Sequence, residues 1–169
     1  EYMCGFADGY DLVLDYMKPK ELNYSGFDYS DSVVAVLRNR RPDLNVWHQD
    51  VTKFRPAPGT FNLAVLLGGL HHVPDHVDSV LESVSVGLER GGLFLNIEPT
   101  HGNILFQRVR ESIYRRNALF DQETERAFNV TDLVEKFRQH GFEAIDVSHP
   151  GLLAYVLYYN PDAFPGLNI

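Results

Sequence analysis

Three acidic residues in the first fifty positions each stand beside a segment that could form part of a ligand site. Glu1 precedes a turn rich in small residues (4–9), whereas Asp28 and Asp50 each end a short apolar run. At the edge of a parallel sheet, a glycine turn lets the backbone approach a ligand, and carboxylates at strand ends accept hydrogen bonds from it. We therefore expect a nucleoside site, with Asp28 on the ribose hydroxyls and Asp50 at the adenine amino group.

Strands and helices alternate along the chain, which predicts the sheet that would carry these acids. Short apolar runs indicate strands, and apolar side chains at helical spacing indicate helices. The expected strands span 23–28, 44–48, 61–67 and 93–97; the expected helices span 9–17, 31–37, 77–88 and 130–140, with Ser30 or Asp31 and Asn129 as caps and Gly91-Gly92 and Gly141 as stops. This order predicts one α/β domain over 1–169, with a doubly wound, mostly parallel sheet covered on both faces.

The end of the chain predicts a different strand pairing. Two further apolar runs, 143–148 and 152–159, are joined only by His149-Pro150-Gly151, and so short a link requires an antiparallel hairpin. A parallel sheet that ends in such a hairpin differs from the parallel sheet of a dinucleotide-binding domain.

Residues 101–128 interrupt the alternation, because a strand-to-helix connection is usually about 2–6 residues long. This segment has its own helical pattern and begins beside Glu98, at the expected ligand edge. We expect a helical cap over an acceptor pocket, inserted after the fifth strand, with Arg108, Arg115 and Arg116 as candidate substrate contacts. A solvated helix face, neutralised by nearby acids, is the alternative.

In their order and spacing these segments resemble the motifs of the class I S-adenosylmethionine-dependent methyltransferases. Residues 1–9 resemble the family's acid and glycine-rich turn, 66–73 its segment after the fourth strand, and 88–93 its turn into the fifth. The resemblance implies S-adenosylmethionine as the cofactor and places Tyr29 against the adenine ring. The cofactor contacts that it implies are Glu1, Met3, Gly5, Asp8, Asp28, Tyr29, Asp50, Val51, Leu67 and Gly68.

The chain departs from the family pattern in its first turn and at the first strand. Met3 and Ala7 stand where the family favours glycine, and a side chain at position 3 narrows the approach to the methionine part of the cofactor. Glu1 is expected at the end of the first strand, in the middle of the sheet. Without that strand its two neighbours would lose their hydrogen-bond partners, so we expect residues before Glu1, rather than another chain, to complete it.

Methyl transfer to an alcohol also needs a group that takes the acceptor's proton, and histidine suits this role. His72 is the first candidate, followed by His71, Glu98 and His101, although one of the two adjacent histidines is expected to pack structurally. No metal is expected, because no third ligand accompanies His72 and His76 at metal-site spacing. The single cysteine, Cys4, is expected to be a small buried filler rather than a nucleophile.

Composition restricts the possible partners. The net charge of −8 argues against nucleic acid, and no apolar run approaches the ~20 residues of a membrane helix.

We expect a cytoplasmic methyltransferase that acts on oxygen or nitrogen of a small-molecule acceptor, with its oligomeric state left open. An NAD(P)-dependent oxidoreductase is an alternative, because Asp28 could hold that ribose, but the chain has no G-x-G-x-x-G. A non-catalytic cofactor-binding module is the third interpretation, supported only by Met3, Ala7 and the missing first strand.

Overall fold

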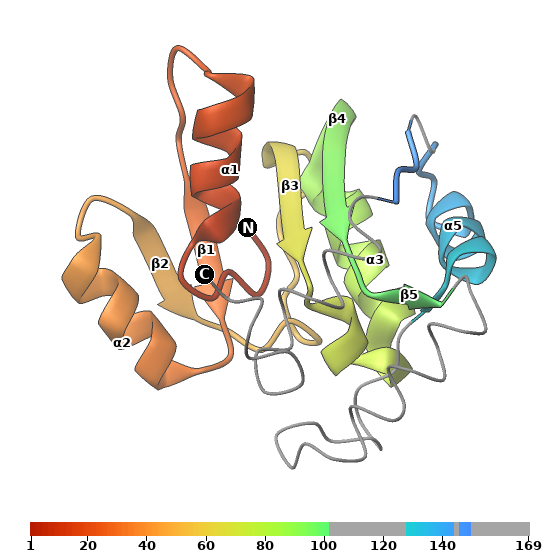
Figure 1. The fold of residues 1–169 in the computed structure, drawn as a ribbon, viewed down its shortest axis with the longest axis horizontal. Coiled ribbons are helices and arrows are strands. Elements are labelled where there is room, and N and C mark those ends of the chain that lie inside the picture. The colour runs from red at the N-terminus through yellow and green to blue at the C-terminus, as the bar shows by residue number, and fades with distance from the viewer. Residues whose placement is uncertain (102–127, 144–145, 150–169) are drawn as a thin grey trace, which may run out of the picture.

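The computed structural model describes residues 1–101, 128–143 and 146–149 (Figure 1). In chain order the elements are α1 (Asp8–Met17), β1 (Ser25–Asp28), α2 (Asp31–Arg40), β2 (Asn45–His48), β3 (Phe61–Leu67), the short 3-10 turns η1 (Leu70–His72) and η2 (Pro74–His76), α3 (Val77–Gly87), β4 (Leu88–Ile97), β5 (Thr100–His101), β6 (Phe128–Asn129) and α5 (Val130–Gln139). Strands and helices therefore alternate as the sequence predicts.

The first residues of the chain join two pairs of parallel strands. β1 pairs with β2, and β3 pairs with β4, in both cases parallel. Tyr2 lies between these pairs: its N–H donates to the Val65 carbonyl at 2.9 Å, and the Phe27 N–H donates to the Glu1 carbonyl at 3.2 Å. The strands thus run in the order β2, β1, residues 1–4, β3, β4, and Glu1 lies in the middle of the sheet as expected.

Apolar side chains cover both faces of this sheet. The larger cluster is built around α3, which contributes Val77, Val80, Leu81 and Val84 and packs on Ala64 and Leu66 of β3. A smaller cluster contains Cys4, Ala7, Leu37, Leu44 and Val46, and so lies under α1 and α2. Burying a Val or Leu side chain contributes about 1.5–3 kcal/mol, so the α3 face supplies much of the stabilisation. The prediction of a mostly parallel α/β fold is confirmed.

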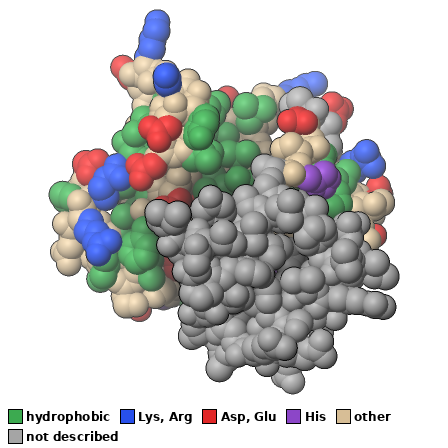
Figure 2. Space-filling model, in the orientation of Figure 1, with side chains coloured by type: hydrophobic (Ala, Val, Ile, Leu, Met, Phe, Trp, Pro, Cys, Tyr) green, Lys and Arg blue, Asp and Glu red, His purple; other side chains and the backbone are tan. Residues whose placement is uncertain are grey.

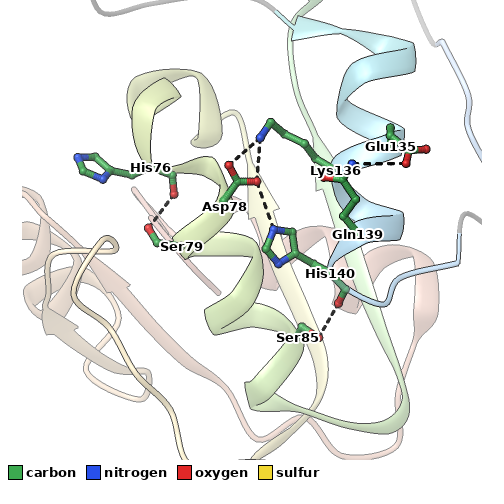
Figure 3. Close-up of polar contacts among 8 residues, drawn as sticks. All are labelled: His76, Asp78, Ser79, Ser85, Glu135, Lys136, Gln139 and His140. Carbon is green, nitrogen blue, oxygen red and sulfur yellow. Dashed lines mark hydrogen bonds and ion pairs between the residues drawn. The ribbon is translucent and has the colours of Figure 1, made fainter.

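Helix α5 packs beside α3 through one apolar and one polar contact region (Figures 1 and 3). Leu133 is buried in the larger cluster. At the surface, Lys136 Nζ donates to both oxygens of Asp78 at 2.7 Å, and His140 Nε2 lies 3.2 Å from Asp78 Oδ1. The Ser85 hydroxyl donates to the His140 carbonyl at 2.8 Å, which ties the end of α5 to α3.

The predicted caps are present. The Ser30 hydroxyl accepts a hydrogen bond from the Val33 N–H, and Asn129 Oδ1 accepts one from the Thr131 N–H at 2.8 Å. These contacts satisfy N–H groups that have no partner inside the first helical turn.

The end of α3 differs from the prediction. The helix ends at Gly87, and β4 already begins at Leu88, which pairs with Phe61. Leu63 pairs with Leu93, so residues 89–92 bulge out of the strand and Gly91 takes a φ of 82° there. The two glycines therefore belong to a bulge inside β4 and do not end α3, because Leu88 before them already pairs with β3.

Two short strands frame the segment that interrupts the alternation. Thr100 pairs with Phe128 and His101 with Asn129, in parallel. The segment therefore leaves and returns at adjacent positions. The rest of the predicted cap, with Arg108, Arg115 and Arg116, lies outside the described residues.

The C-terminal hairpin stays a prediction. Residue 143 and residues 146–149 have no regular secondary structure, and the second predicted strand, 152–159, lies outside the described residues.

The surface over α1 and α2 carries charged side chains of both signs with hydrophobic ones between them (Figure 2). Arg41 illustrates the mixture, because it pairs with Asp11 at 3.2 Å and its guanidinium lies over the Tyr10 ring. Within the described ranges, no helix has the length and apolar character needed to cross a membrane.

Candidate cofactor site

The carboxyl ends of the parallel strands meet at one edge of the sheet. There the Gln49 N–H donates to the Asp28 carbonyl at 2.9 Å, and the Gly68 N–H donates to the Ile97 carbonyl at 2.7 Å. The chain proceeds outward from the central strand to β1 and β2 and then crosses to β3 on the other side. Such a reversal of strand order is where open parallel sheets bind ligands.

The turn after the central strand has left-handed backbone angles at positions 3, 5 and 7, although only position 5 is a glycine. Met3, Gly5 and Ala7 have φ values of 51°, 51° and 69°. A left-handed backbone costs a non-glycine residue roughly 1–2 kcal/mol, so Met3 and Ala7 hold a strained conformation. A β carbon at Gly5 would have no atom within 4 Å. The turn therefore retains the shape that admits a ligand, and the space over Gly5 is open.

Asp28 links this turn to the end of β1. Its Oδ2 accepts a hydrogen bond from the Gly5 N–H at 3.0 Å, and its Oδ1 accepts one from the Ser30 N–H at 2.9 Å. Each carboxylate oxygen has a second lone pair, so Asp28 can also accept hydrogen bonds from ribose hydroxyls. Tyr29 follows directly and is 68% exposed, which leaves its ring free to lie against a base.

Asp50 is fixed in its ionised form. Its Oδ1 accepts hydrogen bonds from the N–H and hydroxyl of Thr52 at 2.9 and 2.7 Å, and Lys53 Nζ lies 3.0 Å from Oδ2. The Thr52 hydroxyl and then Lys53 lower the pKa of Asp50 to about 2. Val51 anchors the loop because its side chain is buried in the larger core, and its N–H has no hydrogen-bond partner within the described part of the chain. A carboxylate and an adjacent N–H donor can together bind the edge of an adenine.

The Glu1 side chain holds the turn between the central strand and α1 in place. Its carboxylate accepts hydrogen bonds from the Gly9 N–H at 2.9 Å and from the Tyr24 hydroxyl at 2.7 Å. Burial raises the pKa of this carboxyl, while the Tyr24 hydrogen bond opposes the rise. One Glu1 oxygen therefore positions the start of α1 and the other holds Tyr24 before β1; the exposed Asp8 lies favourably at the positive end of α1.

Cys4 is a buried filler, as predicted. Its side chain is 3% exposed, and burial, with the carboxylates of Glu1 and Asp28, raises the pKa of the thiol to about 12. A thiol with a raised pKa is a poor nucleophile.

The loop after β3 is held by Glu98, a role that the sequence reasoning missed. The Glu98 side chain is only 1% exposed. Its Oε1 accepts hydrogen bonds from the N–H groups of Gly69 and Leu70 at 2.9 and 2.8 Å. The available signal was an acid at the end of one strand opposite a glycine turn at the end of its neighbour. Glu98 holds the loop in which Leu67 and Gly68 lead into η1, and Gly68 takes a φ of 64°.

The candidate proton acceptors lie beside this anchor. His71 Nδ1 lies 2.9 Å from Glu98 Oε2, and the His71 and His72 rings are in contact, with centroids 4.0 Å apart and planes inclined by 37°. His72 is exposed, whereas the His71 side chain is 16% exposed. The backbone of His101 lies in β5, close along the chain to Glu98. His71 is therefore held structurally, as expected of one of the two adjacent histidines. No group of three or more metal-binding side chains occurs among the described residues.

Comparison with known proteins identifies the family. A family model described as "Methyltransferase domain" matches residues 1–92. A curated Mycolicibacterium smegmatis protein, "Probable S-adenosylmethionine-dependent methyltransferase", is 28% identical over 143 residues, which are 85% of this chain and 51% of that protein. The chain thus spans about half the length of this relative. It belongs to the class I S-adenosylmethionine-dependent methyltransferase family, whose cofactor is S-adenosylmethionine.

Solved structures share the fold at low sequence identity. YcgJ from Bacillus subtilis has a TM-score of 0.69 at 15% identity, with 87% of this chain and 62% of that chain covered. A structure described as S-adenosylmethionine-dependent methyltransferases from Methanosarcina mazei has a TM-score of 0.62 at 18% identity, with 84% and 77% covered.

The described residues fit S-adenosylmethionine. The space over Gly5 is open, so the backbone of the turn can approach the cofactor there. Asp28 can hold the ribose, and Asp50 with the Val51 N–H can hold the adenine edge. No observation tests these contacts individually, so each stays a prediction.

Proposed function

We propose that this chain transfers the methyl group of S-adenosylmethionine to an oxygen or nitrogen of a small-molecule acceptor. The observation that carries the proposal is that Gly5, Asp28 and Asp50 follow the carboxyl ends of the central strand, β1 and β2, along one edge of the sheet. When bound, the cofactor supplies a methyl group already activated on a sulfonium. The protein's main task is then to hold the acceptor in line with that methyl group, and such positioning can remove much of a reaction barrier.

His72 is the proposed proton acceptor for an alcohol substrate. Its ring contacts that of His71, whose own position is fixed by the buried Glu98 carboxylate. This arrangement gives His72 a defined place at the cofactor edge. Glu98 suits the supporting role, because its oxygens already accept hydrogen bonds from three backbone N–H groups.

The cofactor assignment is tested by calorimetry with S-adenosylmethionine, S-adenosylhomocysteine and NAD. Asp28→Ala removes a charged acceptor worth about 1.5–3 kcal/mol, so S-adenosylhomocysteine affinity should fall at least tenfold. Asp43→Ala, which removes an exposed acid before β2, is the matched control, and Asp28→Asn serves if the alanine variant fails to fold. Unchanged binding by a folded Asp28 variant contradicts the site, and binding of NAD alone favours the oxidoreductase. Turnover in an acceptor screen separates an enzyme from a non-catalytic module.

We also propose that residues 101–128 cover the acceptor pocket. The support is that the two ends of the segment pair with each other as β5 and β6 and that β5 begins shortly after Glu98. Parallel strands need a crossover of about a dozen residues or more, so the test replaces 102–127 with a Gly/Ser linker of that length. We expect turnover to be lost while S-adenosylhomocysteine affinity stays within a few-fold. Retained methylation contradicts a cap, and would leave Arg108, Arg115 and Arg116 without a substrate role.

A further inference from the structure

Met3 and Gly69 face each other across the reversal point of the sheet. A β carbon built on Gly69 would lie 2.8 Å from both Met3 Sδ and Leu66 Cδ2 and 3.3 Å from Met3 Cβ, and real β carbons essentially never approach other atoms to less than 3.0 Å. The Met3 side chain therefore occupies, together with that of Leu66, the place that a side chain at position 69 would take. It bridges the turn after the central strand and the loop that Glu98 holds after β3.

The backbone at Met3 is strained, as it also is at Ala7 in the same turn. Met3 keeps a φ of 51°, which glycine adopts at no cost and other residues rarely adopt. Strained backbone of this kind concentrates at ligand sites, where it is retained for what the side chain does there. Methionine is unbranched and adaptable, so its side chain can fill an irregular space beside a ligand.

The order of the strand ends places Met3 at one end of the bound cofactor. Asp50 follows β2 and Asp28 ends β1, so the adenine and ribose extend from β2 toward the central strand. Adjacent strands lie about 4.8 Å apart, and the next positions in the same direction are residues 3–5 and 68–70. The sulfur and amino-acid tail of the ligand would extend into this region, where the Met3 side chain lies beside Gly69 and packs on the larger core cluster.

We propose that Met3 is a specificity-determining residue that restricts the space for the amino-acid tail of the cofactor. The proposal rests on the proposed function, since it concerns the same ligand. Met3 lowers the preference of the site for ligands with the tail over ligands that end at the thioether. A glycine at position 3 would restore that preference and would relieve the backbone strain.

The test compares S-adenosylhomocysteine with 5′-methylthioadenosine, which keeps the nucleoside and the sulfur but lacks the tail. Calorimetry on the full chain should show that Met3→Gly binds S-adenosylhomocysteine at least fivefold more tightly, while methylthioadenosine affinity changes less than twofold. Met3→Leu, which keeps the side-chain volume, should retain the parent ratio of the two affinities. An unchanged ratio in Met3→Gly overturns the proposal. Failure of the parent to bind either ligand overturns the proposed function as well, so the two failures are distinguishable.

A second variant tests the contact without a ligand. Gly69→Ala should lower the melting temperature by several degrees, because its β carbon meets the side chains of Met3 and Leu66. The Met3→Gly/Gly69→Ala double variant should recover the part of that loss that Met3 causes, whereas the part caused by the buried Leu66 side chain should remain. Equal melting temperatures for Gly69→Ala and the parent would show that the two residues do not compete for this space, and would remove the basis of the proposal.

Discussion

The Glu98 carboxylate and the His71 imidazole lie 2.9 Å apart at the edge where β3 and β4 end. The same carboxylate also accepts the His71 N–H at 3.3 Å, so it fixes both the ring and the backbone of this residue. The Glu98 side chain is almost fully buried, which keeps water from replacing either contact. The loop that borders the cofactor edge is thus positioned by a residue far away in the sequence.

Glu98→Gln should destabilise the protein. The amide oxygen accepts fewer of the hydrogen bonds, and the amide nitrogen faces N–H donors, so at least one buried donor loses its partner. Leaving a buried donor unsatisfied costs about 1–3 kcal/mol, and chemical denaturation should show a loss of this size. Glu82→Gln, at an exposed position of α3, is the control. Equal stability of the Glu98 variant and the parent would contradict the anchoring role.

Thr52→Val should raise the pKa of Asp50 from about 2 toward the ordinary 3.8, because the Thr52 hydroxyl is the main cause of the depression. Since the folded pKa lies below the ordinary value, ionised Asp50 stabilises the fold above about pH 4. That stabilisation is lost as the pH falls toward 2. The variant should therefore be less stable above pH 4 and should lose less stability on acidification. An NMR titration of the Asp50 carboxyl measures the change in its pKa. Thr52→Ser, which keeps the hydroxyl, should titrate like the parent.

The polar contact between α3 and α5 should matter less than the apolar one. Asp78 is 62% exposed, so removing its partner by Lys136→Met should cost at most about 1 kcal/mol, although it should raise the pKa of Asp78. Leu133 is buried between the two helices and the sheet, and Leu133→Ala should cost about 2–5 kcal/mol. Equilibrium unfolding of both variants gives the comparison. A larger loss for Lys136→Met would show that the ion pair, rather than the core, docks α5.

His72→Gln should lower kcat for an alcohol acceptor by about 10²–10⁴-fold, the usual contribution of a positioned proton acceptor. S-adenosylhomocysteine affinity should stay within a few-fold, and the acid limb of the pH–rate profile should disappear. His76→Gln, at the exposed end of η2, is the control. If His72→Gln lowers kcat without changing the pH profile, the residue positions the loop instead of taking the proton.

The sequence by itself determined the local structure. β3 spans Phe61–Leu67 as predicted, because a short and almost entirely apolar run between turn residues has one stable place, inside a sheet. Ser30 and Asn129 cap the predicted helices, since capping depends only on residues two or three positions apart. The placement of Asp28 and Asp50 at one edge also followed, because parallel strands bring their carboxyl ends together.

Tertiary structure alone decided the contacts between distant segments. The burial of Glu98 against the loop after β3, the bulge at 89–92 and the contact of Met3 with Gly69 all depend on how neighbouring strands align. Local periodicity carries no information about such alignment, because a side chain's partner across a sheet is set by register rather than by spacing along the chain. For the same reason the sequence marked Glu98 as a reacting group, and only the fold showed that its oxygens are already committed to backbone N–H donors.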